Sequence, residues 1–160
     1  MPNPAVHMVG LIADTHGLIR PGVHDALQGV ELILHAGDVG GSGILDELGL
    51  IAPVKAVFGN TDPPGDPALA DQIDLRIGGA RIHVSHGHEV GSPNPVRLAE
   101  RYDADVVVYG HTHKQLVTKL GEQLFVNPGA AGPRRFKLSP SVARMTISDG
   151  KAEVEIIDLT

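Results

Sequence analysis

Short apolar runs rich in Val, Ile, Leu and Ala recur through the first two-thirds of the chain, and each has the length of a buried β-strand. They predict strands at residues 6–13, 31–36, 54–58, 80–85 and 106–109. Each run leads into Asp, Asn or His, usually beside a glycine. Because the carboxyl ends of parallel strands meet at one edge of a sheet, we expect these polar side chains to lie in one crevice.

The segments between the early strands have the spacing of short helices. Pro21 and Pro95 suit the first turn of a helix, and Ser42 is the expected N-cap of another. The apolar residues of the middle helix recur every three or four positions and stop before Pro53. The predicted helices cover residues 21–28, 42–51 and 95–101.

The second half of the chain has the pattern of antiparallel hairpins. Gly78-Gly79 and Asp149-Gly150 each separate two strand-like segments, which is the strongest short-range hairpin signal. The paired segments are 72–77 with 80–85, 115–120 with 123–126, and 141–147 with 152–157. Early strand–helix units followed by hairpins predict an α/β fold in which two packed mixed β-sheets are flanked by helices. We expect a single domain over residues 1–160.

Composition and charge narrow the function classes. The 160 residues carry a formal net charge of −6, which disfavours a large basic groove for duplex nucleic acid. A phosphate substrate stays compatible with this charge, because bound divalent cations reverse the local field. No cysteine is present, so any metal site must use nitrogen and oxygen ligands. Without a signal peptide or a membrane-spanning apolar run, the expected location is the cytoplasm.

Aspartate, asparagine and histidine at the ends of the five apolar runs are the candidate site residues. Each has an ordinary structural reading: Asp14 could cap a helix, and Asn60 is a frequent turn residue. Their recurrence at five strand ends favours a common metal site, because imidazole, carboxylate and amide groups are all metal ligands. The candidates are Asp14, His16, Asp38, Asn60, His86, His111 and His113.

In order along the chain, these residues form the blocks D-x-H, G-D, G-N, H-G-H and G-H-x-H. The series resembles the calcineurin-like metallophosphoesterases, above all their small prokaryotic phosphodiesterase branch, and also the phosphoesterase-like subunit of the retromer coat. The resemblance implies an α/β/β/α sandwich and two divalent ions, with Mn, Fe, Co, Ni or Zn preferred over Ca or Mg. It implies a first ion held by Asp14, His16, Asp38 and His113. A second ion would be held by Asp38, Asn60, His86 and His111.

By the same resemblance, Asp38 bridges the two ions and helps to hold the hydroxide that attacks phosphorus, so no protein nucleophile is needed. Thr61 stands where the wider family has a histidine thought to protonate the leaving oxygen. Threonine is no general acid near neutral pH, and a positioned acid contributes about 10²–10⁴-fold in rate. No other residue is assigned as the acid, although His88 or a metal-bound water could take its place.

The other polar residues receive weaker assignments. His35 and His88 are expected to support the ligands through hydrogen bonds. Arg134 and Arg135 could bind a phosphate oxygen of the substrate, or they could be two solvated loop charges. Residues 62–67 are expected to form a loop over the site, with Asp62 and Asp66 as loop charges. The structural or surface histidines are His7, His24 and His83.

The sequence therefore predicts a metal-dependent phosphodiesterase acting on a small-molecule phosphate diester. Two alternatives stay open: a phosphomonoesterase, and a protein-interaction scaffold of the same fold with little or no activity. The sequence also leaves open that the protein forms a homo-oligomer. The seven ligating side chains favour the enzyme, whereas the missing acid at Thr61 is the feature that a scaffold would explain.

Overall fold

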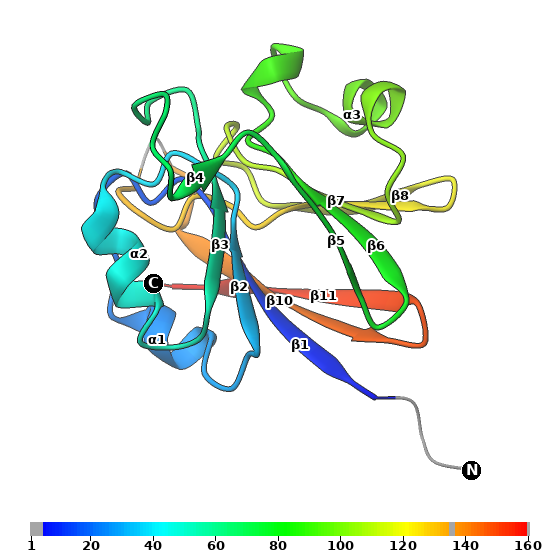
Figure 1. Ribbon diagram of the computed structural model, residues 1–160, viewed down its shortest axis with the longest axis horizontal. Coiled ribbons are helices and arrows are strands. Elements are labelled where there is room, and N and C mark those ends of the chain that lie inside the picture. Colours follow the sequence, from blue (N-terminus) through cyan, green and yellow to red (C-terminus); the bar gives the residue numbers. More distant parts are fainter. Residues whose placement is uncertain (1–4, 135–136, 160) are drawn as a thin grey trace.

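The computed structural model describes residues 5–134 and 137–159, whose strands form two β-sheets packed face to face (Figure 1). The larger sheet has the strand order β11-β10-β1-β2-β3-β4. Strands β1 to β4 run parallel to one another, and β10 pairs antiparallel with both β1 and β11. Its strands are β1 (His7–Ile12), β2 (Leu32–His35), β3 (Val54–Val57), β4 (Leu69–Ala70), β10 (Ser141–Ser148) and β11 (Lys151–Asp158).

The smaller sheet has the order β5-β6-β7-β9-β8. Its three inner strands are parallel, and an antiparallel strand forms each edge. Its strands are β5 (Ile73–Ile77), β6 (Ala80–Val84), β7 (Val106–Val108), β8 (Leu116–Leu120) and β9 (Gln123–Asn127). The helices are α1 (Gly22–Ala26), α2 (Ser42–Leu48), the 3₁₀ turn η1 (His88–Val90) and α3 (Pro95–Arg101).

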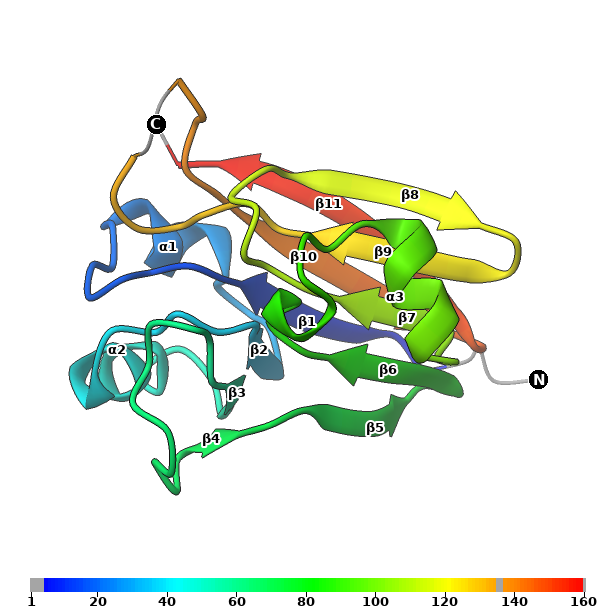
Figure 2. The same ribbon diagram turned by 90° about the horizontal axis from the view of Figure 1, so that it is seen from above.

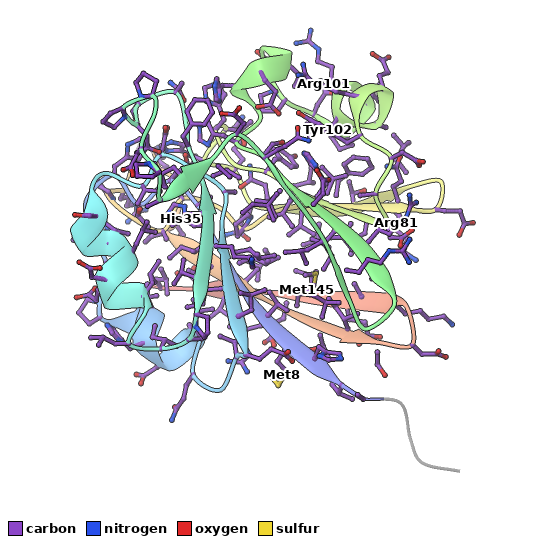
Figure 3. The ribbon with its side chains drawn as sticks, in the orientation of Figure 1. Met8, His35, Arg81, Arg101, Tyr102 and Met145 are labelled. Atoms are coloured by element: carbon purple, nitrogen blue, oxygen red, sulfur yellow. The ribbon has the colours of Figure 1, made fainter. Side chains whose placement is uncertain are left out.

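Apolar side chains form three layers of packing. The central layer fills the space between the two sheets and includes Leu11, Val84, Val108 and Met145, the last of which is labelled in Figure 3. A second layer packs α1 and α2 against the outer face of the larger sheet, and a third packs α3 against the smaller sheet (Figures 1 and 2). The predicted fold class, two mixed sheets flanked by helices, is therefore confirmed.

Both tight hairpins are confirmed, because the two residues of each turn have positive φ. The values are 57° and 87° at Gly78-Gly79 and 54° and 76° at Asp149-Gly150. The predicted cap of α2 is wrong. Gly41, with φ 120°, is the N-cap, and the Ser42 side chain makes no capping hydrogen bond. The helices at 21–28 and 42–51 are also shorter than predicted, since turns follow Ala26 and Leu48.

The short strand β4 is not among the predicted elements. Leu69 and Ala70 pair with Ala56 and Val57, so the segment after the Pro-rich loop returns to the edge of the larger sheet. A two-residue strand carries too little periodicity to be recognised from sequence. No helix within the described residues is long and apolar enough to cross a membrane.

Candidate metal centre

The polar residues at the predicted strand ends lie together at one edge of the sandwich. They follow β1, β2 and β3 of the larger sheet and β6 and β7 of the smaller sheet, which all present their carboxyl ends at this edge (Figure 2). The structure therefore brings all seven candidates together: Asp14, His16, Asp38, Asn60, His86, His111 and His113.

The backbone at this edge is unusual. Five of the seven candidates have left-handed φ angles, although none is glycine; the values are 53° at Asp14, 45° at His16, 54° at Asp38, 72° at His111 and 64° at His113. Each such residue costs on the order of 1–2 kcal/mol. The turns after β1, β2 and β7 thus direct these side chains into the site at an energetic cost, as is common at functional sites.

One group of donor atoms surrounds the carboxylate of Asp14, which is fully buried. Its Oδ1 lies 3.6 Å from Nε2 of His113 and 4.0 Å from Nε2 of His16. One ligand atom from each of these residues lies within 4.8 Å of the other two. This is a set of one carboxylate and two imidazoles that could hold a divalent transition metal.

A second group surrounds His86, which is also buried. Its Nε2 lies 3.3 Å from Oδ2 of Asp38 and 3.0 Å from Oδ1 of Asn60. The same amide oxygen lies 3.1 Å from Nδ1 of His111. The Asp38 atom Oδ2 is also 3.6 Å from Nε2 of His16, so this carboxylate lies between the two groups.

Electrostatics favour ionised carboxylates here. Burial alone would raise the pKa of Asp38, but hydrogen bonds from His86 and from the backbone N–H of Thr61 hold it well below its usual range. Burial likewise opposes the charged form of His86, yet the Asp38 and Asp14 carboxylates raise the pKa of that imidazole. Burial, together with the nearby His86, lowers the pKa of His111. The two carboxylates thus favour positive charge beside them.

The other face of His86 fixes the orientation of its ring. Nδ1 lies 2.8 Å from the carbonyl oxygen of Ala36, which can only accept a hydrogen bond, so Nδ1 carries hydrogen. This leaves Nε2 directed at Asp38 and Asn60. A histidine whose outer nitrogen donates to a carbonyl is the usual arrangement for a metal ligand.

Two glycines make room for these side chains. A Cβ at Gly59 would overlap the carboxylate and backbone nitrogen of Asp38, and one at Gly37 would lie 2.7 Å from Nδ1 of His86. Gly37 also has φ 102°. The glycines beside Asp38 and Asn60 therefore have a steric reason: only glycine lets neighbouring strand ends approach this closely.

Thr61 lies at the exposed rim of the site, next to Asn60. Its backbone N–H donates to Oδ1 of Asp38 at 2.9 Å and so orients that carboxylate.

The interpretation of Asp62 as a loop charge misses its structural role. The residue is 6% exposed, and its carboxylate accepts backbone N–H groups of Val39, Gly40 and Gly59 at 2.8–3.1 Å. It thereby joins the turn that carries Asp38 to the turn that carries Asn60. Asp66, in contrast, lies in the outer part of the loop, where its side chain accepts the local N–H of Ala68 at 2.9 Å.

His35 lies fully buried at the end of β2 (Figure 3). Its Nδ1 accepts the N–H of Gly37 at 3.1 Å, so Nε2 carries hydrogen and donates to Oγ1 of Thr15 at 3.0 Å. The Thr15 hydroxyl donates in turn to the carbonyl oxygen of Val39 at 2.6 Å. Burial lowers the pKa of His35 to about 3. A neutral His35 therefore ties together the two turns that carry Asp14, His16 and Asp38.

His88 begins the 3₁₀ turn η1 and lies against the site on the His86 side. Its ring centroid is 5.4 Å from that of His86 and 6.4 Å from that of His111. Phe58 packs edge-on against the same ring at 5.4 Å. His88 thus packs beside two of the candidate ligands.

The arginine pair is described only at its first member. Arg134 is exposed, and Arg135 lies outside the described residues. The preceding loop does approach the site, because the N–H of Gly132 donates to the carbonyl oxygen of Asp14 at 3.3 Å and a Cβ at Gly132 would overlap the backbone of Thr15.

The remaining histidines lie away from the cluster, paired with carboxylates. His7 contacts Glu31 at 3.0 Å, His24 lies 3.9 Å from Glu47, and His83 contacts Asp74 at 2.8 Å.

A family model for the calcineurin-like phosphoesterase superfamily domain matches residues 8–150, which include every residue of this cluster. The chain belongs to this superfamily. It is 35% identical over 158 residues to a probable metallophosphoesterase of Methanothermobacter thermautotrophicus, covering 94% of this chain and 91% of that protein. It is 27% identical over 139 residues to a phosphodiesterase of Methanocaldococcus jannaschii, covering 76% of this chain and 82% of that one.

Solved structures agree with this assignment. A single mutant of Vps29 from Entamoeba histolytica superimposes with a TM-score of 0.79 and 27% identity, covering 94% of this chain and 98% of that chain. The chain is thus similar in architecture to Vps29 and in sequence to the two named phosphoesterase relatives.

Proposed function

We propose that this protein is a phosphodiesterase that uses two divalent metal ions to hydrolyse a small-molecule phosphate diester. The observation that carries the proposal is the position of Asp38. Its single oxygen Oδ2 lies 3.6 Å from His16 and 3.3 Å from His86, which belong to the two different donor groups. A carboxylate shared in this way is what a pair of adjacent ions needs as a bridge.

The residues fit divalent ions on chemical grounds. The donors are imidazole nitrogens and carboxylate or amide oxygens, which suit Mn, Fe, Co, Ni or Zn. Asp14 and Asp38 are both buried, and both are negatively charged when ionised. Burying a charge is costly unless an opposite charge lies beside it, and bound divalent ions would supply such a charge.

In this proposal, Asp14, His16, Asp38 and His113 hold the first ion, and Asp38, Asn60, His86 and His111 hold the second. When bound, two such ions provide a hydroxide nucleophile near neutral pH and neutralise charge on the phosphate oxygens.

The protein's own residues act by positioning. Thr61 donates its N–H to Asp38, and Asp62 holds the two neighbouring turns in register. His16, His111 and His113 are partly exposed, so the site is open to a substrate from solvent. Arg134 is proposed to contact a phosphate oxygen that does not react.

The leaving group sets the substrate preference. Thr61 supplies no proton near neutral pH. We therefore propose that the enzyme favours diesters whose leaving group departs as a stable anion, without needing to be protonated. The Methanocaldococcus jannaschii relative, which is named a phosphodiesterase, supports a diester over a monoester substrate.

The test is hydrolysis of an activated aryl phosphodiester after chelation and re-addition of Mn²⁺, Ni²⁺, Zn²⁺ or Mg²⁺. Wild type is compared with Asp38→Ala and His113→Ala, and the matching aryl phosphomonoester is assayed in parallel. We expect metal-dependent turnover of the diester that falls more than about a hundredfold in both variants. Binding of nearly two equivalents of metal without turnover would contradict the enzyme and favour a scaffold. Faster hydrolysis of the monoester would contradict the diester preference.

A further inference from the structure

The edge strand β8 differs from the other sheet edges. The larger sheet ends in β4, which is only two residues long, and in β11, which exposes Lys151, Glu153, Glu155 and Asp158. The smaller sheet ends in β5, which exposes Asp74 and Arg76. Short length and exposed charge are the usual means by which proteins prevent edge-to-edge pairing.

In contrast, β8 exposes mainly apolar side chains. Leu116 is 36% exposed, Val117 39% and Leu120 41%, and Lys119 is the strand's single charged residue. Figure 2 shows β8 along the outer edge of the smaller sheet, at the end opposite to β5. Its outward backbone groups are therefore in position to pair with another strand.

The pairing of β8 with β9 shows which of its side chains share a face. Thr118 is opposite Phe125, which packs beneath α3, so Leu116, Thr118 and Leu120 lie on the outer face of the sheet. Val117 and Lys119 are opposite Val126 and Leu124 and face the other sheet.

We propose that β8 is a self-association surface, through which two copies of this chain pair antiparallel and join their smaller sheets into one continuous sheet. The pairing is centred on Thr118, which lies opposite Thr118 of the second copy. Leu116 then lies opposite Leu120 on the same outer face, and this contact occurs twice because a two-fold interface is self-complementary.

Charges support this register. Lys114 precedes the strand and Glu122 lies in the turn that follows it, so pairing about Thr118 brings Lys114 of each copy to the end of the strand pair where Glu122 of the other copy lies. Placing the two-fold axis between two residues, rather than on one residue, would put outer-face side chains opposite inner-face ones, which sheet pairing does not allow. Centring on Lys119 would place two lysines opposite each other, and centring on Val117 would separate Lys114 from Glu122.

An apolar groove continues this surface. It has a volume of about 480 Å³ and is bounded by Pro93, Pro95, Tyr109 and Leu116, among others. Since Leu120 of the second copy would lie opposite Leu116, its side chain would cover the rim of this groove. Pairing would thus bury apolar surface beyond the strand itself.

Cysteine cross-linking tests the register directly, because the natural chain contains no cysteine. Residues opposite each other in an antiparallel pair have Cα atoms about 4.5–5.5 Å apart, which a disulfide can span. We expect the Thr118→Cys variant to form a covalent dimer under mild oxidation. Val117→Cys is the control for register. Leu50→Cys, at an exposed site outside β8, is the control for random collision. Both control variants are expected to cross-link far less than Thr118→Cys.

Association of the full chain is measured by analytical ultracentrifugation over a concentration series. We expect a dimer whose dissociation constant rises at least about tenfold in Leu116→Lys/Leu120→Lys and stays unchanged in Leu50→Lys. Lys114→Glu and Glu122→Lys should each weaken the dimer, and the double variant should restore it. A wild-type monomer at the highest soluble concentration would overturn the proposal, as would a dimer that none of the β8 variants weakens.

Discussion

The carboxylate of Asp62 accepts a hydrogen bond of 2.8 Å from the backbone N–H of Gly59, which lies three residues earlier in the chain. Through Val39 and Gly40, the same carboxylate also holds the turn after β2. One buried side chain therefore fixes the relative positions of Asp38 and Asn60.

Replacing this carboxylate should be costly. We expect Asp62→Ala to lower the free energy of unfolding by about 3 kcal/mol, because it leaves several buried N–H groups without an acceptor. Metal affinity should fall about 10–100-fold as the two turns separate. Urea denaturation and calorimetric titration with Mn²⁺ measure the two effects. Asp66→Ala, in the same loop but at a less buried position, is the control and should cost less than about 1 kcal/mol. Equal losses in both variants would contradict the assigned role.

A second prediction follows from the absence of a side chain at Gly59. Because a Cβ there would overlap Asp38, Gly59→Ala should reduce metal-dependent turnover by about a hundredfold or more. Gly43→Ala is the matched control. Gly43 lies in α2, where an added Cβ would meet no other atom within 4 Å, so alanine should preserve turnover and stabilise the helix by about 0.5–1 kcal/mol. Full activity in Gly59→Ala would contradict this prediction, because it would show that Asp38 can move without loss of turnover.

The buried His35 makes folding sensitive to acid. Its pKa is lowered from the ordinary 6.5 to about 3 in the folded chain, so between these values the unfolded state binds a proton that the folded state does not. Stability from the neutral ring is therefore complete above about pH 6.5 and decreases as the pH falls, by about 1.4 kcal/mol per pH unit.

Urea denaturation of the metal-free protein between pH 7.5 and 5 measures this dependence. The slope of stability against pH should be smaller in His35→Gln than in wild type by about that amount. Identical slopes in wild type and His35→Gln would mean that His35 titrates normally in the folded protein.

Thr61 offers a gain-of-function prediction. Thr61→His places an imidazole beside Asn60 while keeping the backbone N–H that orients Asp38. We expect the rate on an alkyl diester, relative to an activated aryl diester, to rise at least about tenfold, a part of the 10²–10⁴-fold that a positioned acid provides. Thr61→Val, which has the same shape as threonine, should leave this ratio unchanged. If both variants change it equally, the effect comes from the shape of the rim rather than from acid catalysis.

Much of the site could be predicted from sequence because the information is local. Each ligand candidate directly follows a strand, and strand periodicity places these ends at one edge. The role of Asp62 could not be predicted, since two of its partners, Val39 and Gly40, are more than twenty residues away and Asp66 looks the same in sequence. The limits of α1 and α2 could not be predicted either, because tertiary packing and turns decide where short helices end.

The two sheets contribute unequally but jointly to the candidate centre. The larger sheet supplies Asp14, His16, Asp38 and Asn60, and the smaller one supplies His86, His111 and His113. Neither half of the chain holds a complete donor set. An ion bound by the proposed ligands would act as a cross-link between the sheets, so metal loading should report whether they have docked during folding and should slow their separation.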